Sequence, residues 1–203
     1  MSFQRLSQTA EEYWQAFEVY HDNQAHCAHF KRESERLRFL SLLAFTSLDA
    51  QVNAFWLIRV LPEWQEVLSL IDNLLKDDSE LAKLLELAGP ELNRAQMIAS
   101  LRFIAHSGEP SKFSPTFTDC GLVWLLMSEA RAADAKYVRV AKVLFHLQRI
   151  RNSCFHTGRE FNELKGKEAL FLLHEWKEIA PSMHPAFEAP LKYDLDAPEV
   201  KAA

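Results

Sequence analysis

The sequence predicts an all-α protein built as a helical bundle, and three observations lead to this fold class. Apolar residues recur at helical spacing along most of the chain, and no alternating run is long enough for a sheet. Only 5 of the 203 residues are Gly, which argues against turn-dense all-β folds. Hydrophobic residues make up 48% of the chain, enough to bury a core. We expect one helical domain over residues 1–180 and an extended tail with four prolines at 181–203.

Local capping and breaking signals delimit the helices. Thr9 and Glu12 form a capping-box pattern, which predicts that the first amphipathic helix begins there. The apolar stretch Phe39–Leu61 predicts a buried helix, and Pro62 predicts a break before the next one. Further helices are expected at Glu63–Lys76, Ser79–Ala88 (capped by Ser79 and ended by Gly89-Pro90), Glu91–His106, Leu122–Ala135, Tyr137–His156 and Glu163–Ile179.

One long irregular stretch interrupts this pattern. Residues Ser107–Thr118 contain Gly108, Pro110 and Pro115 among serines and threonines. A connection of this length is uncommon in a compact domain and is typical of a loop that carries a site or forms a flap. The sequence therefore predicts an exposed functional loop at this point of the bundle.

Charge and cysteine usage limit the classes of function. The net charge of −5 excludes a globally basic nucleic-acid coat, yet Arg131–Arg159 carries seven bases against one acid. That basic segment either binds a phosphate-bearing ligand or balances the charge of the acidic segment Glu63–Arg94 across the bundle. The acidic segment has eight acids and three bases. Three dispersed Cys, an N-terminus unlike a signal peptide and no long apolar run predict a cytoplasmic protein that does not enter membranes.

The strongest local signal lies near the end of the Tyr137–His156 helix. On a wheel of about 100° per residue, Arg151 falls about 40° from Leu147, inside the apolar stripe. A guanidinium in such a stripe needs a desolvated partner or must extend to solvent. Asn152 and His156, at positions i and i+4, share the flank of the same helix. Arg151 is therefore a candidate anion clamp.

This segment resembles the HEPN superfamily of all-α domains, whose members carry an Arg, four to six residues and a His on one helix. Arg151, Asn152 and His156 match that pattern, including the polar residue after the Arg. Many HEPN-like chains also place an acidic residue in an early helix close to the Arg and His. On this sequence the resemblance points to Asp49, assisted by Asn53, because both share a face with apolar residues of their helix.

The resemblance implies a metal-independent endoribonuclease that needs no cofactor. His156 would act as general acid and base, Arg151 would stabilise the scissile phosphate, and Asn152 would donate a hydrogen bond or orient the imidazole. Cleavage would leave a 2′,3′-cyclic phosphate, which restricts the substrate to RNA. Chains of this kind are typically homodimeric toxins or abortive-infection effectors of antiviral defence. A regulatory protein or antitoxin holds them inactive, although Gly158 replaces the Tyr that adenylating antitoxins modify.

Several alternatives remain open. A buried Asp49–Arg151 ion pair that only fixes helix register is a structural explanation, and Arg149 is a second candidate for the clamp. A non-catalytic HEPN-like module that binds RNA, a nucleotide or a protein is the main alternative function, and a helical interaction protein is another. Lys112, Lys142 and Arg159 are generic phosphate-facing candidates. The histidines near residues 21–29 lack a second half-site, so no metal site is predicted.

Overall fold

The computed structural model describes residues 3–107, 114–127, 135–152 and 162–181, and within these ranges the chain contains no strand. The predicted all-α class is confirmed. Nor is any helix in these ranges both long and apolar enough to cross a membrane. The α-helices are α1 (Phe3–Asp22), α2 (Glu33–Phe55), α3 (Trp64–Lys76), α4 (Asp78–Ala88), α5 (Arg94–His106), α6 (Phe117–Met127), α7 (Ala135–Arg151) and α8 (Glu163–Ile179).

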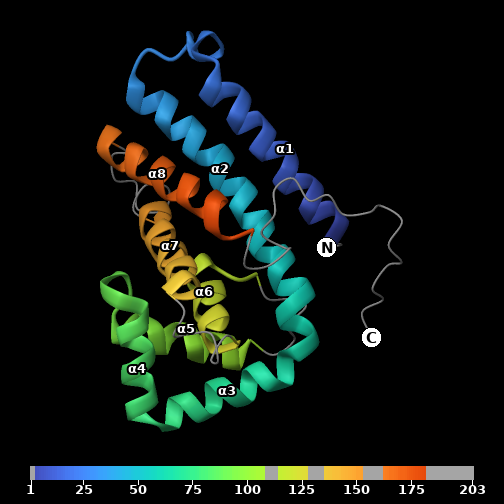
Figure 1. Ribbon diagram of the computed structural model, residues 1–203, viewed down its shortest axis with the longest axis vertical. Coiled ribbons are helices and arrows are strands. Elements are labelled where there is room, and N and C mark those ends of the chain that lie inside the picture. The colour runs from blue at the N-terminus through green and yellow to red at the C-terminus, as the bar shows by residue number, and fades with distance from the viewer. Residues whose placement is uncertain (1–2, 108–113, 128–134, 153–161, 182–203) are drawn as a thin grey trace.

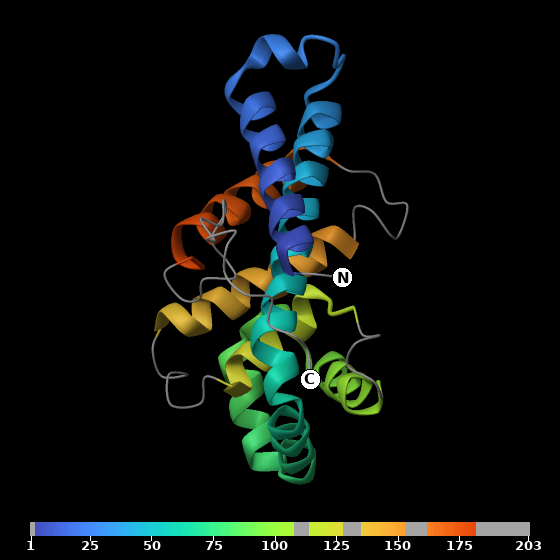
Figure 2. The same cartoon turned by 90° about the vertical axis from the view of Figure 1, so that its right-hand side faces the viewer.

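The helix α2 is the axis of the molecule (Figures 1 and 2). It pairs with α1 as a long antiparallel hairpin, and Ser47 Oγ donates a buried hydrogen bond of 2.7 Å to the carbonyl of Ala10. From Leu37 onward α2 is buried on most sides, as expected for a helix that is apolar nearly all round. A π-helical turn (Trp56–Val60) and a 3-10 turn (Leu61–Glu63) then lead into α3. Pro62 lies in the first turn of the latter, where the sequence predicts the break.

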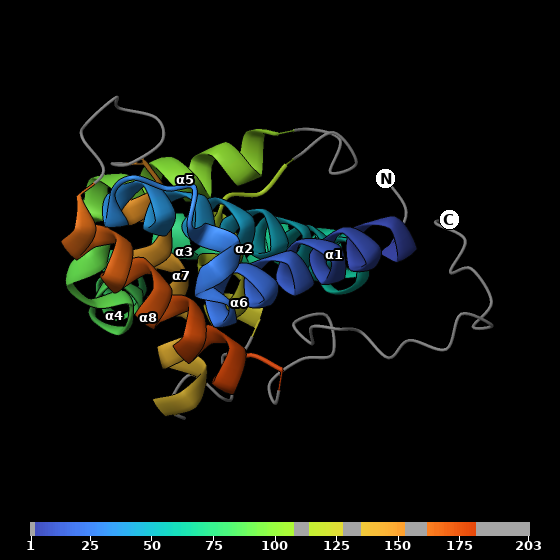
Figure 3. The same cartoon turned by 90° about the horizontal axis from the view of Figure 1, so that it is seen from above.

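Among the helices that follow α2, α8 packs on it most closely. Figures 2 and 3 show α5 and α8 on opposite sides of α2, while α3 runs away from its lower end in Figure 1. Trp176 of α8 donates a buried hydrogen bond of 2.9 Å from Nε1 to Gln51 Oε1 of α2. A Cβ on Gly121 of α6 would lie 2.6 Å from Cε1 of Phe145 on α7, so the close approach of these two helices requires glycine.

Most errors of the sequence-based prediction fall at helix starts. The first helix begins at Phe3, and Thr9 lies inside it, where its hydroxyl donates to the carbonyl of Arg5. Asp77, not Ser79, caps α4, because its carboxylate accepts from the amides of Ser79 and Glu80. Thr9 and Ser79 are both residue types that can cap a helix, but each lies inside its helix, which begins earlier in the chain.

Other helices also start away from their predicted positions: α2 begins at Glu33 rather than Phe39, and α7 begins at Ala135 rather than Tyr137. The helix expected from Glu91 begins at Arg94, because Gly89, with φ of 75°, and Pro90 form a 3-10 turn first. Asn93 and Gln96 then form the capping box of α5. The helix expected from Leu122 already begins at Phe117.

Reciprocal bonds between Thr116 and Asp119 fix the start of α6. The predicted loop therefore ends at residue 116 rather than 118, and its residues 108–113 lie outside the described ranges, as does most of the predicted tail.

Candidate functional site

An ion pair joins the end of α7 to the middle of α2. Arg151 Nη2 lies 2.7 Å from Asp49 Oδ2, although 102 positions separate the two residues in the chain. The side chains are 27% and 33% exposed, so the pair is partly desolvated but open to solvent. The predicted proximity of Asp49 and Arg151 is confirmed.

An aromatic ring supports the Arg151 guanidinium. Its Cζ lies 5.2 Å from the ring centroid of Phe117, the first residue of α6, a geometry that allows a cation–π interaction. Within the described residues, Asp49 is the sole hydrogen-bond partner of this side chain. The guanidinium is thus held on two sides by Asp49 and Phe117, and Nε and Nη1 are donors that no other part of the described ranges engages.

A short relay orients Asn152. The buried Gln148 accepts a hydrogen bond of 3.0 Å from the backbone amide of Phe117 and donates one of 2.7 Å to Asn152 Oδ1. Since the carbonyl oxygen of Asn152 is engaged, its exposed amide group is the part that can donate to a ligand. Phe117 therefore supports both Arg151 and, through Gln148, Asn152.

Asn53 belongs to the same group but does not reach Arg151. Its Nδ2 donates 2.7 Å to the backbone carbonyl of Asp49, one turn earlier on α2. Asn53 can act on the site only through the backbone that carries Asp49. His156, Arg159 and Lys112 lie outside the described residues, so the structure places Arg151 and Asn152 of the predicted catalytic set.

Arg149 does not join the Asp49 group. It lies two residues before Arg151, about 200° away around the helix. Its Nε is 3.1 Å from Glu91 Oε2, without hydrogen-bond geometry, and its Nη2 is 2.8 Å from His146 Nε2. The same nitrogen of His146 lies 2.6 Å from Glu168 Oε1 of α8. Arg149 therefore belongs to a separate cluster that joins α7 to α8 and to the 3-10 turn Gly89–Glu91.

The other bases of α7 have similar explanations. Lys142 lies nine residues before Arg151, on the opposite side of the helix, and its side chain lies over Gly89. Arg139 pairs with Glu175 of α8. Acidic side chains of α8 and Glu91 thus form ion pairs with Arg139 and Arg149 of this helix. These pairs favour the interpretation that the basic charge of α7 balances acidic charge elsewhere in the bundle. Arg151, on the other side, is the base of α7 that the structure places with Asn152.

Sequence analysis missed two members of the site, Gln148 and Phe117. A polar Gln beside the apolar stripe of α7 is a usable signal, since a buried amide needs partners. Phe117 carries no such signal, because an aromatic residue at a helix start is an ordinary core residue. Its role depends on how α6 packs against α7.

The described residues contain no group of three His, Cys, Asp or Glu side chains able to hold a metal ion. The arrangement around Arg151 instead offers hydrogen-bond donors to an anion. Comparison with protein-family models, with curated proteins and with solved structures finds no match for this chain.

Proposed function

We propose that the protein is a metal-independent endoribonuclease of the HEPN type, acting as a toxin or antiphage defence effector under the control of a regulatory protein. The observation that carries the proposal is the Arg151 guanidinium, which Asp49 and Phe117 hold at the end of α7 beside Asn152. His156 follows five residues later in the motif. An acidic residue from an early helix close to the Arg is also found in many HEPN-like chains.

The proposed reaction is a transesterification within the RNA. The ribose 2′-oxygen attacks the adjacent phosphorus, and the bond from phosphorus to the 5′-oxygen of the next nucleotide breaks. His156 takes up or delivers the proton that moves between these oxygens, since an imidazole exchanges protons near neutral pH. The products are a 2′,3′-cyclic phosphate and a 5′-hydroxyl.

Arg151 and Asn152 would stabilise the charge that develops on the phosphate. The free guanidinium donors suit the planar fork that binds phosphate oxygens, and Asp49 holds this fork in one orientation. The Asn152 amide adds a neutral donor whose direction Gln148 sets. Preorganised donors of this kind need no rearrangement during the reaction, which is the source of their catalytic effect.

Cleavage of end-labelled RNA by single variants tests the assignment. His156→Ala and Arg151→Ala should each lower the rate on the order of 10²–10⁴-fold. Arg151→Lys should not restore it, because an ammonium group lacks the bidentate fork. Arg149→Ala is the matched control on the same helix and should leave cleavage intact. Thermal melts of each variant separate loss of activity from loss of folding.

Two outcomes would contradict the proposal. A folded His156→Ala variant that still cuts RNA would remove the nuclease assignment. A wild-type chain that binds RNA through Arg151 but never cuts it would favour the non-catalytic binding module.

The proposed reaction uses no metal ion, so EDTA should leave cleavage unchanged. Rescue of an EDTA-inhibited reaction by a divalent ion would indicate a different chemistry.

A further inference from the structure

The tip of the α1–α2 hairpin differs from the rest of the molecule in how its basic side chains are paired. Across the described residues, Arg and Lys side chains commonly contact a carboxylate. Such pairs are Arg59–Glu63, Lys76–Asp72, Lys83–Glu80, Arg94–Asp78, Arg139–Glu175, Lys167–Glu163 and Lys177–Glu18. Paired bases have much of their charge neutralised and contribute little to the attraction of a distant anion.

Lys31 and Arg32 lack such a partner. Both are exposed, they directly precede α2, and no described carboxylate lies within ion-pair distance of either side chain. Arg38, about one and a half turns into α2, is also exposed and unpaired among the described residues. These three unpaired cations lie within eight consecutive positions. In Figures 1 and 2 this end of the hairpin extends beyond the other helices.

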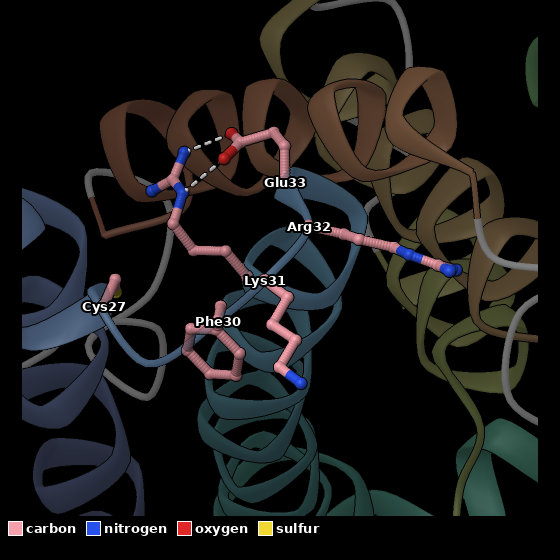
Figure 4. A pocket seen from close by; sticks show the side chains of 6 residues that line it. Cys27, Phe30, Lys31, Arg32 and Glu33 are labelled. Carbon is pink, nitrogen blue, oxygen red and sulfur yellow. Dashed lines mark hydrogen bonds and ion pairs between the residues drawn. The ribbon is translucent and has the colours of Figure 1, made fainter.

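An open hollow of about 300 Å³ lies at this tip. Six residues line it, namely Cys27, Phe30, Lys31, Arg32, Glu33 and Arg36 (Figure 4). Glu33 does not neutralise Lys31 or Arg32, because it accepts two hydrogen bonds from Arg36, at 2.5 and 2.8 Å. This hydrogen bonding lowers the pKa of the Glu33 carboxyl, so the carboxylate that Arg36 contacts is ionised at neutral pH. Glu35, the other carboxylate at this tip, accepts a hydrogen bond of 3.2 Å from the backbone amide of Lys31 and forms no ion pair with either cationic side chain. Among the described residues both side chains are therefore left to act on a ligand.

The directions of these side chains indicate the kind of anion. In Figure 4 the Lys31 and Arg32 side chains extend away from each other and from Glu33. Diverging cations cannot surround a single phosphate ion, but they can contact successive phosphates of a polymer. The half-buried ring of Phe30 packs against two other rings, with its centroid 4.0 Å from that of His29 and 5.4 Å from that of Phe39.

We propose that the hairpin tip, defined by Lys31, Arg32 and Arg38, is a docking surface for the sugar-phosphate backbone of the RNA substrate. This inference rests on the proposed ribonuclease function and adds a second contact region to it. From Glu33 to Asp49 the chain rises 16 residues along α2, which is about 24 Å at 1.5 Å per residue. A single-stranded RNA long enough to bridge this distance contacts both regions, whereas a dinucleotide bound at Arg151 does not.

The test measures RNA affinity as a function of salt in a His156→Ala background, so that binding is separated from cleavage. For single strands, log Kobs falls with log salt by about 0.7 for each phosphate contact. The double variant Lys31→Gln/Arg32→Gln should therefore lower this slope by about 1.4, which corresponds to binding weakened about 25-fold at 0.1 M salt. Poly(A) and poly(U) should show the same loss, because the contacts are to the backbone.

The matched control is Lys76→Gln/Lys83→Gln, which removes the same charge from α3 and α4 at the far end of the molecule (Figure 1). This control should leave the slope unchanged. With His156 present, the tip variant should cleave a long RNA more slowly at low substrate concentration and a dinucleotide at the wild-type rate.

Different failures can be told apart. If the wild-type chain cuts RNA but the tip variant keeps its affinity and salt slope, only the docking surface is wrong. The same conclusion follows if the control variant loses as much affinity as the tip variant. If the wild-type chain neither binds nor cuts any RNA, the proposed function itself is wrong.

Discussion

Arg151 is a charged side chain in the middle of the buried arc of α7. Val143, Leu144, Leu147 and Ile150 around it are buried. The contact with Asp49 and the ring of Phe117 make this position tolerable, because they replace part of the hydration that burial removes. Both partners remain about a quarter to a third exposed, so the pair should contribute less than a fully buried one.

A double-mutant cycle on Asp49→Ala and Arg151→Ala measures this contact. We expect a coupling energy of about 1 kcal/mol, between the values typical of exposed and of buried pairs. Urea unfolding of the wild type, both single variants and the double variant gives the number. The exposed pair Asp72–Lys76 on α3 is the control and should couple by about 0.3–0.5 kcal/mol. Additive effects at Asp49 and Arg151 would mean that the ion pair adds no stability.

Cys120 predicts a loss of stability at alkaline pH. Burial, and then the negative charge of Asp119, raise the pKa of its thiol far above the ordinary value. Above the unfolded value of about 8.5 the unfolded chain loses this proton while the folded chain keeps it. The free energy of unfolding should therefore fall by about 1.4 kcal/mol per pH unit from this group alone.

Urea unfolding of the wild type and of Cys120→Ala at pH 8, 9 and 10 isolates that contribution. The difference between the two proteins should change with pH in favour of the variant, because Ala has no proton to lose. Parallel pH profiles would show that the thiol ionises freely in the folded state.

At the scale of elements, the N-cap residue determines where a helix begins, and α4 is an example. The Asp77 carboxylate accepts from the amides of Ser79 and Glu80 at 2.9 and 3.2 Å, which satisfies two donors at the start of α4. Its negative charge also lies at the positive end of the helix dipole. Ser79, which the sequence suggests as the cap, lies inside the helix.

Asp77→Ala should lower the free energy of unfolding by about 1 kcal/mol, the usual cost of a lost N-cap. Ser79→Ala is the matched control two residues away and should change stability by less than about 0.5 kcal/mol. Thermal or urea unfolding of both variants compares them directly. A larger effect at Ser79 than at Asp77 would contradict the capping geometry.

At the scale of the whole molecule, the proposed function predicts an assembly of two chains. One chain supplies a single Arg and His of the motif, and in the HEPN pattern two such sets converge on one phosphate. We therefore predict a homodimer with α7 at or beside the two-fold axis, since closed two-fold dimers are the commonest assembly. Light scattering at micromolar concentration should give twice the chain mass of 23.4 kDa. A monomer with full cleavage activity would exclude this arrangement.

The sequence predicted which segments are helical better than it predicted the residues at which the helices begin. The last helix, Glu163–Ile179, is correct at both ends, and the Glu63–Lys76 prediction differs from α3 by one residue. Apolar period and breaker residues are local properties, so they can be read without the fold. The starts at Thr9 and Ser79 are wrong because several nearby polar residues could cap, and the geometry of the preceding segment selects among them.

In the candidate site, too, some residues could be predicted from the sequence and others could not. Arg151 and Asp49 could be found from the sequence, because each is a charged group on an apolar helix face and such groups need partners. Which of Arg149 and Arg151 meets Asp49 depended on the rotation of α7 against α2. The support from Phe117 and Gln148 depended on the packing of α6 against α7.

The sequence by itself thus determined that this chain is helical, roughly where its helices lie, and that Arg151 needs a partner. These properties follow from periodicity and from the cost of burying a charge, which act over a few residues. Only the tertiary structure decided that Arg139 and Arg149 of α7 face acids of α8 and Glu91, and that Lys31, Arg32 and Arg38 at the hairpin tip have no carboxylate partner among the described residues. Pairing between side chains distant in sequence depends on how whole helices rotate and cross, because a contact of a few ångströms is set by packing across the bundle.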